Sequence, residues 1–311
     1  MPKKPIVQWT GLLSLLLAVA ACGSATPSDP AVPTASGEPA RPKDAMGIAA
    51  SLVQGRISAL VFVDRVKPHP VGAKLLNLGP AKDLLEGSKF DPLRDVTKAV
   101  VVSNNAREER AIVFAEHSVD AKLIPALVAE LAGKSEPPGE VLEAAPNWTV
   151  KVAKKGRAGV VCFLPPRFVV VLPVDLADRC SAFAETGGLP DPQGTEAAAI
   201  MVTEPADSLR ARGVPKIPAT VTGLTATVVL NDGGGATIDA VGQSTPENAA
   251  ADAASLTRGI DDATSVNLGI VKIRAFGPVQ FTPAEDKVKS HLDLSAAELD
   301  QILSLAETFI E

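Results

Sequence analysis

The residues Lys98-Ala-Val-Val-Val-Ser103 and Arg110-Ala-Ile-Val-Phe-Ala-Glu116 form two short apolar runs, and the polar pair Asn104-Asn105 begins the segment between them. β-branched and aromatic residues dominate both runs, which is typical of strands. The separation is too short for a crossover helix, so the two strands must run in opposite directions. This part of the chain therefore predicts an antiparallel hairpin.

Similar elements flank this hairpin. Ala59-Leu-Val-Phe-Val63 is expected to form an earlier strand. After the hairpin, Asp120 is expected to cap a helix whose apolar residues recur at helical spacing, at Leu123, Ile124, Leu127, Val128 and Leu131. Three further strands are expected at Thr149–Ala153, Gly159–Leu164 and Phe168–Leu172.

The order of elements recurs after Gly187-Gly188-Leu189-Pro190-Asp191-Pro192, which has the composition of a boundary. Each half is expected to read strand, helix, two strands, helix, strands, helix. No repeat of individual residues accompanies this order, so duplication is a hypothesis. Hairpins with helices favour an antiparallel sheet over a parallel Rossmann sheet. We therefore expect an α+β fold of two similar lobes, 45–190 and 191–311, each a mainly antiparallel sheet with helices packed on one face.

The N-terminus carries a separate signal. Lys3 and Lys4 precede an apolar run from Gly11 to Ala20, which is too short to span a bilayer and ends in small residues. This layout predicts a secretory signal peptide over residues 1–21. Val19-Ala20-Ala21-Cys22 resembles the lipobox of bacterial lipoproteins, and the resemblance implies that Cys22 is lipidated and becomes the mature N-terminus.

The next residues, 22–44, are rich in Pro, Ser, Ala and Gly and show no apolar period. Such a composition cannot bury a core, so a disordered tether between lipid and body is expected. The protein would then be anchored in the bacterial cell envelope by its lipid. Gly23 stands where lipoproteins retained in the inner membrane of Gram-negative bacteria carry aspartate, which implies the outer membrane for a Gram-negative source.

Two other cysteines remain, Cys162 and Cys180. Export would place them in an oxidising compartment, where two thiols of one chain tend to pair. The alternative is a metal or redox pair, but the spacing is far from C-x-x-C and no histidine lies nearby in sequence. We predict a structural disulfide that fixes a short helix at 176–185 to the strand holding Cys162.

The body also resembles uncharacterised bacterial envelope proteins with a two-lobed α+β domain of unknown function. The resemblance rests on Ala59-Leu-Val-Phe-Val63, the expected turn Phe90-Asp91-Pro92-Leu93-Arg94-Asp95-Val96, and the strand Lys98–Val102. It implies a fold shared across most of the mature chain. It carries no catalytic residues with it.

Composition excludes some classes of function. The net charge is −6, whereas nucleic-acid binding needs a basic surface. Aromatic residues make up 4% of the chain and tyrosine is absent, which counts against stacking platforms for bases or sugars. Neither nucleic acid nor a cofactor is therefore expected.

Motifs for chemistry are also missing. The chain has neither the G-x-S-x-G motif of hydrolases nor the H-E-x-x-H motif of zinc enzymes. His69, His117 and His291 lie in separate elements and are expected at the surface or at strand edges. No catalytic residue and no metal ligand is assigned.

One cationic cluster consists of Lys151, Lys154, Lys155 and Arg157, around an expected hairpin tip. It could contact anionic lipid headgroups or an acidic partner. The alternative is that these charges serve only solubility.

The leading hypothesis is a lipid-anchored, non-catalytic envelope protein that binds a protein partner or an apolar ligand. One alternative is an envelope hydrolase with an unrecognised site, for which a polar pocket would have to hold at least two of His117, Glu116, His69 and Asp64. The other is a cup-like protein that carries lipid in an enclosed cavity.

Overall fold

A computed structural model describes residues 44–77, 89–105, 110–154, 156–209, 217–263, 265–267, 272–274 and 277–310. The segment 1–43, with Cys22 and the expected signal peptide and tether, lies outside these ranges. None of the helices in the described ranges has the length and apolar character needed to cross a bilayer.

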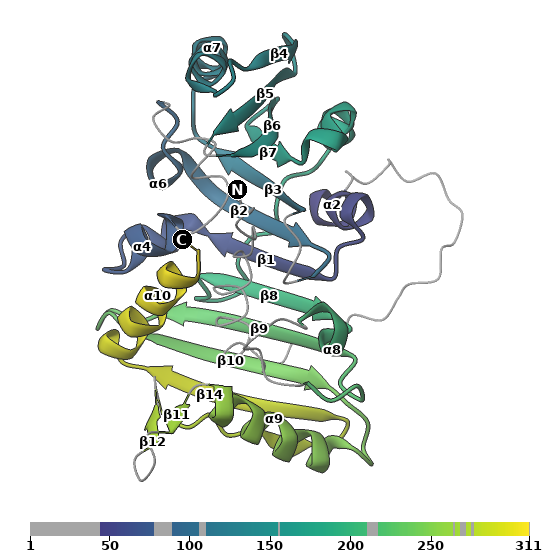
Figure 1. The fold of residues 1–311 in the computed structure, drawn as a ribbon, viewed down its shortest axis with the longest axis vertical. Coiled ribbons are helices and arrows are strands. Elements are labelled where there is room, and N and C mark those ends of the chain that lie inside the picture. The colour runs from purple at the N-terminus through teal and green to yellow at the C-terminus, as the bar shows by residue number, and fades with distance from the viewer. Residues whose placement is uncertain are drawn as a thin grey trace, which may run out of the picture.

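Twelve of the described strands form one antiparallel sheet, and helices pack on it, so the fold is mixed α+β as predicted (Figure 1). The order across the sheet is β13-β14-β10-β9-β8-β1-β2-β3-β7-β6-β5-β4. Their bounds are β1 Ile57–Phe62, β2 Val96–Ser103, β3 Ala111–His117, β4 Glu140–Glu143, β5 Trp148–Lys154, β6 Arg157–Leu164, β7 Phe168–Leu172, β8 Ala198–Thr203, β9 Gly223–Leu230, β10 Ala236–Gln243, β13 Thr282–Ala284 and β14 Lys287–Leu294. A separate hairpin joins β11 (Ser265–Asn267) to β12 (Lys272–Arg274).

The predicted central hairpin is confirmed. β2 and β3 pair antiparallel, with Val100 opposite Phe114 and Val102 opposite Ile112. These four side chains are at most 1% exposed. The hairpin forms because its β-branched and aromatic residues fill a layer that is covered by other elements.

The middle of the sheet joins segments that are far apart in sequence. β1 pairs with β2 on one side and with β8 on the other, and Ala59 lies opposite both Val101 and Ile200. Figure 1 shows β1 and β8 side by side. The sheet is therefore continuous across the boundary expected near residue 190.

Helices connect and cover these strands. The α-helices are α2 Ala45–Val53, α3 Val63–Val66, α4 Gly72–Asn77, α6 Pro92–Asp95, α7 Ile124–Lys134, α8 Pro205–Ser208, α9 Ala249–Ala263 and α10 Ala296–Ile310. Two segments are 3₁₀-helical, η1 (Ala121–Leu123) and η2 (Val174–Phe183). The second of these carries Cys180, so the helix expected at 176–185 is present in a tighter form.

One face of the sheet packs against α7, α9 and α10. The apolar residues of α9 and α10 share a core with β8, β9, β10 and β14, and those of α7 share a core with β5, β6 and β7. On β1, Ile57 and Ala59 belong to the first core and Val61 packs against the second. Because these positions alternate along one strand, both cores lie on the same face.

The opposite face is covered by α2 and η2, but only over β1, β2, β3, β6 and β7. Helices on one face were expected, and for these strands that expectation is wrong. The reason is visible in β7, whose sequence Phe-Val-Val-Val-Leu is buried at every position, so both of its faces need a cover. β9, in contrast, alternates between buried and half-buried side chains.

Candidate functional site

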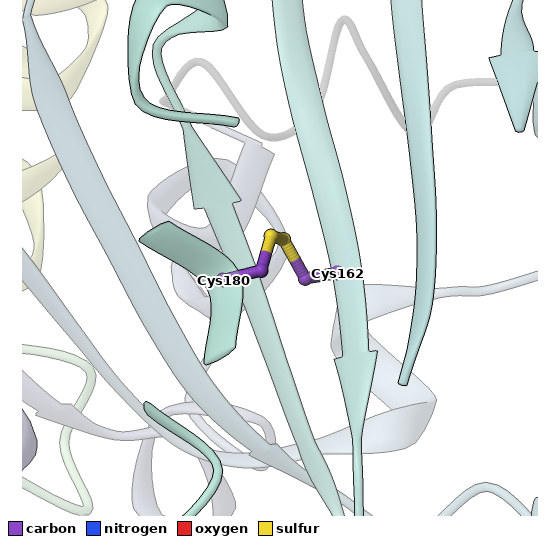
Figure 2. Close-up of a disulfide and its surroundings, with 2 residues drawn as sticks. All are labelled: Cys162 and Cys180. Atoms are coloured by element: carbon purple, nitrogen blue, oxygen red, sulfur yellow. A yellow bond between two sulfur atoms is a disulfide. The ribbon is translucent and has the colours of Figure 1, made fainter. Parts of the chain in front are cut away.

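The cysteine pairing predicted from the sequence is present in the structure. Cys162 on β6 and Cys180 in η2 form a disulfide with their Cα atoms 6.1 Å apart, and both side chains are buried (Figure 2). The bond joins η2 to the strand that it covers. Cys22, the predicted lipidation site, lies outside the described residues.

The cationic cluster divides between the two faces of the β5–β6 hairpin. Arg157 lies directly opposite Lys154, so these two side chains share a face, whereas Lys151 is three residues away on the strand and points to the other face. Lys151 is exposed, but Lys154 and Arg157 are half-buried and each engages a neighbour. Lys155 is outside the described residues.

Two of the three histidines are buried, whereas all three were expected at the surface or at strand edges. His69 is 9% exposed, with Nε2 3.2 Å from the Gly235 carbonyl oxygen, and His117 is 4% exposed. Burial of an imidazole is possible because its neutral form carries no charge and its ring packs like an aromatic residue.

His291, on β14, is exposed. It lies on the face of the sheet opposite α9 and α10, where no described helix covers β9, β10 or β14. Its Nδ1 lies 2.7 Å from Asp239 and its Nε2 3.2 Å from Asp293. Hydrogen bonding to Asp239 raises the pKa of His291, with burial opposing and Asp293 adding to the rise. Because both ring nitrogens are engaged by carboxylates, this side chain is poorly suited to act as a general base.

The residues considered for a hydrolase do not converge. Glu116 and His117 are adjacent on β3 and therefore point to opposite faces of the sheet. Glu116 accepts a hydrogen bond from the Leu189 amide, and Asp64 of α3 pairs with Lys67, the residue that follows this helix. No group of three side chains able to ligate a metal was found among the described residues.

A pocket of about 790 Å³ lies between two segments that the sequence places in different elements, 89–95 and 118–130. We call it the α6–α7 groove. Pockets for small molecules usually have volumes of about 300–1,000 Å³ and combine an apolar lining with a few polar groups. The volume of this groove lies in that range, and its lining combines four apolar residues with six charged ones.

The first wall is the segment expected to form a turn, which is instead a short helix, α6, with a proline in its first turn. Asp91 caps it by accepting a hydrogen bond from the Leu93 amide at 2.9 Å. Pro92 fits because a first-turn amide has no helical partner. Arg94 forms a bidentate pair with the next residue, because its Nε and Nη2 each donate to an oxygen of Asp95 at 2.7 Å.

The bidentate pair with Arg94 favours the ionised form of Asp95. Burial acts to raise the pKa of Asp95, but hydrogen bonds from the Arg94 side chain and the Asp91 amide outweigh it and lower the pKa. Arg94 also donates to the Lys89 carbonyl oxygen at 2.6 Å. The wall is therefore fixed by its own polar contacts.

The second wall is the start of α7. Asp120 caps η1 by accepting from the Lys122 amide at 2.9 Å. Leu123, expected in the apolar stripe of the helix, is 56% exposed and lines the groove. It lies in the 3₁₀ turn, so the α-helical period begins only at Ile124, where Pro125 takes an early position. Val119, Ala126 and Leu127 complete the apolar lining.

His117 packs edge-on against two aromatic rings, with centroids 6.1 Å from Phe90 and 6.0 Å from Phe163. Burial lowers the pKa of His117, a shift that the Phe168 carbonyl and Asp95 only partly oppose. Within the described residues, its buried Nδ1 has no hydrogen-bond partner. His117 is therefore neutral near pH 7.

Four carboxylates and two cations line the groove, and only some of them are paired. Asp95 is paired with Arg94, and Glu130 with Lys134 at 2.7 Å. Lys89 places its charge near Glu130, whose carboxylate also accepts from the Lys89 amide at 3.2 Å. Asp91 and Asp120 cap helical turns through one oxygen each, and neither forms a close ion pair within the described residues, although the charge of Arg94 acts on Asp91.

Comparison with models of protein families, with curated proteins and with solved structures found no match to this chain. Function must therefore be argued from the groove itself. Sequence reasoning singled out Phe90–Asp95 as a motif and Asp120 as a cap, but did not bring them together. The sequence did contain one signal: Leu123 and Ala126 are apolar, three residues apart, and follow the capping Asp120 directly.

Proposed function

We propose that this protein is a lipid-anchored, non-catalytic protein of the bacterial envelope that binds a small apolar or amphipathic ligand in the α6–α7 groove. The observation that carries the proposal is the groove, which combines an exposed Leu123 and an apolar lining with a charged rim. The N-terminal layout ending in Cys22 supports the location. The dispersed histidines favour binding over hydrolysis.

Ligand binding can be tested on the fragment Gly23–Glu311, which retains every described element and all three apolar cores. Nile red, a neutral dye that fluoresces in apolar surroundings, should bind to it. Ala126→Trp should abolish the signal by filling the groove, because Ala126 is exposed on the lining. Ala129→Trp, on an exposed part of the same helix outside the lining, should leave binding unchanged.

If the fragment does not take up the dye, or if both tryptophan variants behave alike, the proposed binding function is wrong. Anchoring is tested separately in the full chain. Radiolabelled palmitate should be incorporated into the exported protein, and Cys22→Ala should stop it. Incorporation that persists in the variant would refute lipidation at Cys22.

We propose in addition that the sheet consists of two similar lobes, 45–190 and 191–311. The order β1-β2-β3-β7-β6 on one side of the β1–β8 pair corresponds to β8-β9-β10-β14-β13 on the other. A short helix follows the first strand of each set, α3 or α8, and a long helix follows the third, α7 or α9. If so, the two segments expressed as separate chains should co-purify through the β1–β8 pair, and failure to associate would count against the division.

A further inference from the structure

We infer that the α6–α7 groove selects amphiphiles with a cationic head, such as a primary ammonium, over those with an anionic head. This rests on the proposed binding function and specifies the class of ligand. The argument comes from the distribution of charge around the apolar lining, because an apolar tail would bind equally well whatever head it carried.

The charges on the rim are unequal. Asp91, Asp95, Asp120 and Glu130 line the groove, against Lys89 and Arg94. The charge of Arg94 is already offset by Asp95, because its Nε and Nη2 donate to that carboxylate and Nη2 donates also to the Lys89 carbonyl oxygen. The remaining cation, Lys89, has the Glu130 carboxylate beside it. Even when Lys134, which pairs with Glu130, is counted, the four carboxylates outnumber the three cations, so an anionic head would meet a net negative charge.

Asp91 and Asp120 are the two carboxylates left for a cation. They stand on opposite walls, each at the start of a helical segment, and each uses only one oxygen in its capping hydrogen bond. The second oxygen of each can accept from an ammonium group, which offers three donors. With its tail over Leu123 and Ala126, an amphiphile would place its head between the two walls.

Because both aspartates act as N-caps, their charge can be removed by a substitution that keeps the fold stable. Asparagine is about as good an N-cap as aspartate, since its side-chain oxygen accepts the same amide hydrogen bond. Asp91→Asn and Asp120→Asn should therefore remove charge while keeping the walls folded. Asp44→Asn is the matched control, because Asp44 caps α2, which covers the other face of the sheet.

The experiment is displacement of Nile red from the fragment Gly23–Glu311 by octylammonium, octanoate and 1-octanol at pH 7, with the two charged amphiphiles below their micelle concentrations and the alcohol below its solubility limit. Octylammonium should displace the dye at concentrations at least about tenfold lower than octanoate, with octanol between them. Each asparagine substitution in the groove should weaken displacement by octylammonium by about fivefold, the effect of one charge at about 4 Å in water. Asp44→Asn should not change it, and 0.5 M NaCl should weaken it by screening.

Equal or stronger displacement by octanoate would overturn the inference, as would a preference that survives in the Asp91→Asn/Asp120→Asn double variant. If Nile red binds and Ala126→Trp blocks it, but neither charged amphiphile displaces it, the head-group selectivity is wrong while the binding function stands. If the dye does not bind at all, the binding function itself fails.

Discussion

At the scale of single residues, His117 shows how burial changes a side chain that looks unremarkable in the sequence. It follows Glu116 in a strand, and nothing in that position distinguishes an edge residue from a buried one. The strand β7 covers one side of β3, and the rings of Phe90 and Phe163 surround the imidazole. Those contacts come from segments on both sides in sequence, so local patterns could not reveal them.

His117 gives the stability of the protein a dependence on pH. Its pKa in the folded state is lowered from about 6.5 by burial, so between that lowered value and about 6.5 the unfolded chain binds more protons. Its contribution to stability is therefore present above pH 6.5 and is lost as the pH falls below it. We expect His117→Phe to reduce the fall in unfolding free energy between pH 7.5 and 5.5, measured by urea denaturation.

His291 changes the pH dependence of stability in the opposite direction, so the profile of the variant must be compared with that of the wild-type protein. Its pKa is raised in the folded state, so its contribution is present at low pH and is lost as the pH rises through the folded value. His291→Gln is the control and should change the profile in the reverse direction. Parallel profiles for wild type and His117→Phe would contradict the assignment.

At the scale of elements, the sequence predicted most strands and helices and one covalent link. At the last helix, Ser295-Ala-Ala-Glu298 forms a capping box, in which the Glu298 amide donates to the Ser295 hydroxyl and the Ser295 amide donates to the Glu298 carboxylate. The hairpins were predictable because strand patterns and turn residues are local signals. The turn expected at Phe90–Asp95 became a helix, because the Asp91 cap, Pro92 and the Arg94–Asp95 pair stabilise one short turn.

The disulfide is the element-scale contact with the clearest expected effect. It closes a loop of 18 residues between β6 and η2. Cys162→Ala/Cys180→Ala should lower the free energy of unfolding by about 3 kcal/mol, since the unfolded chain regains loop entropy. Chemical denaturation would measure the loss, and reduction of the wild-type protein should reproduce it. A loss below about 1 kcal/mol in both experiments would show that the bond is dispensable for stability.

At the scale of the whole molecule, the β1–β8 pair joins the two halves into one sheet. Ile57 and Ala59 of β1 share an apolar core with Ile200 of β8 and with α9 and α10. Because this core crosses the expected boundary between the halves, we expect a single transition in calorimetry of the fragment Gly23–Glu311. Ile200→Ala should shift the whole transition by about 2–5 kcal/mol, the usual cost of such a truncation in a core. Two resolved transitions, only one of which shifts, would show that the halves unfold independently.

The sequence by itself determined the kinds of element, the antiparallel hairpins, the mixed α+β class and the cysteine pair, because all of these follow from periodicity, capping and the count of thiols. Only the tertiary structure decided that both halves share one sheet, that two histidines are buried, and that the walls at 89–95 and 118–130 line one groove. The physical reason is that pairing between distant strands and packing across a sheet depend on which surfaces are left uncovered. No local pattern in the chain records that.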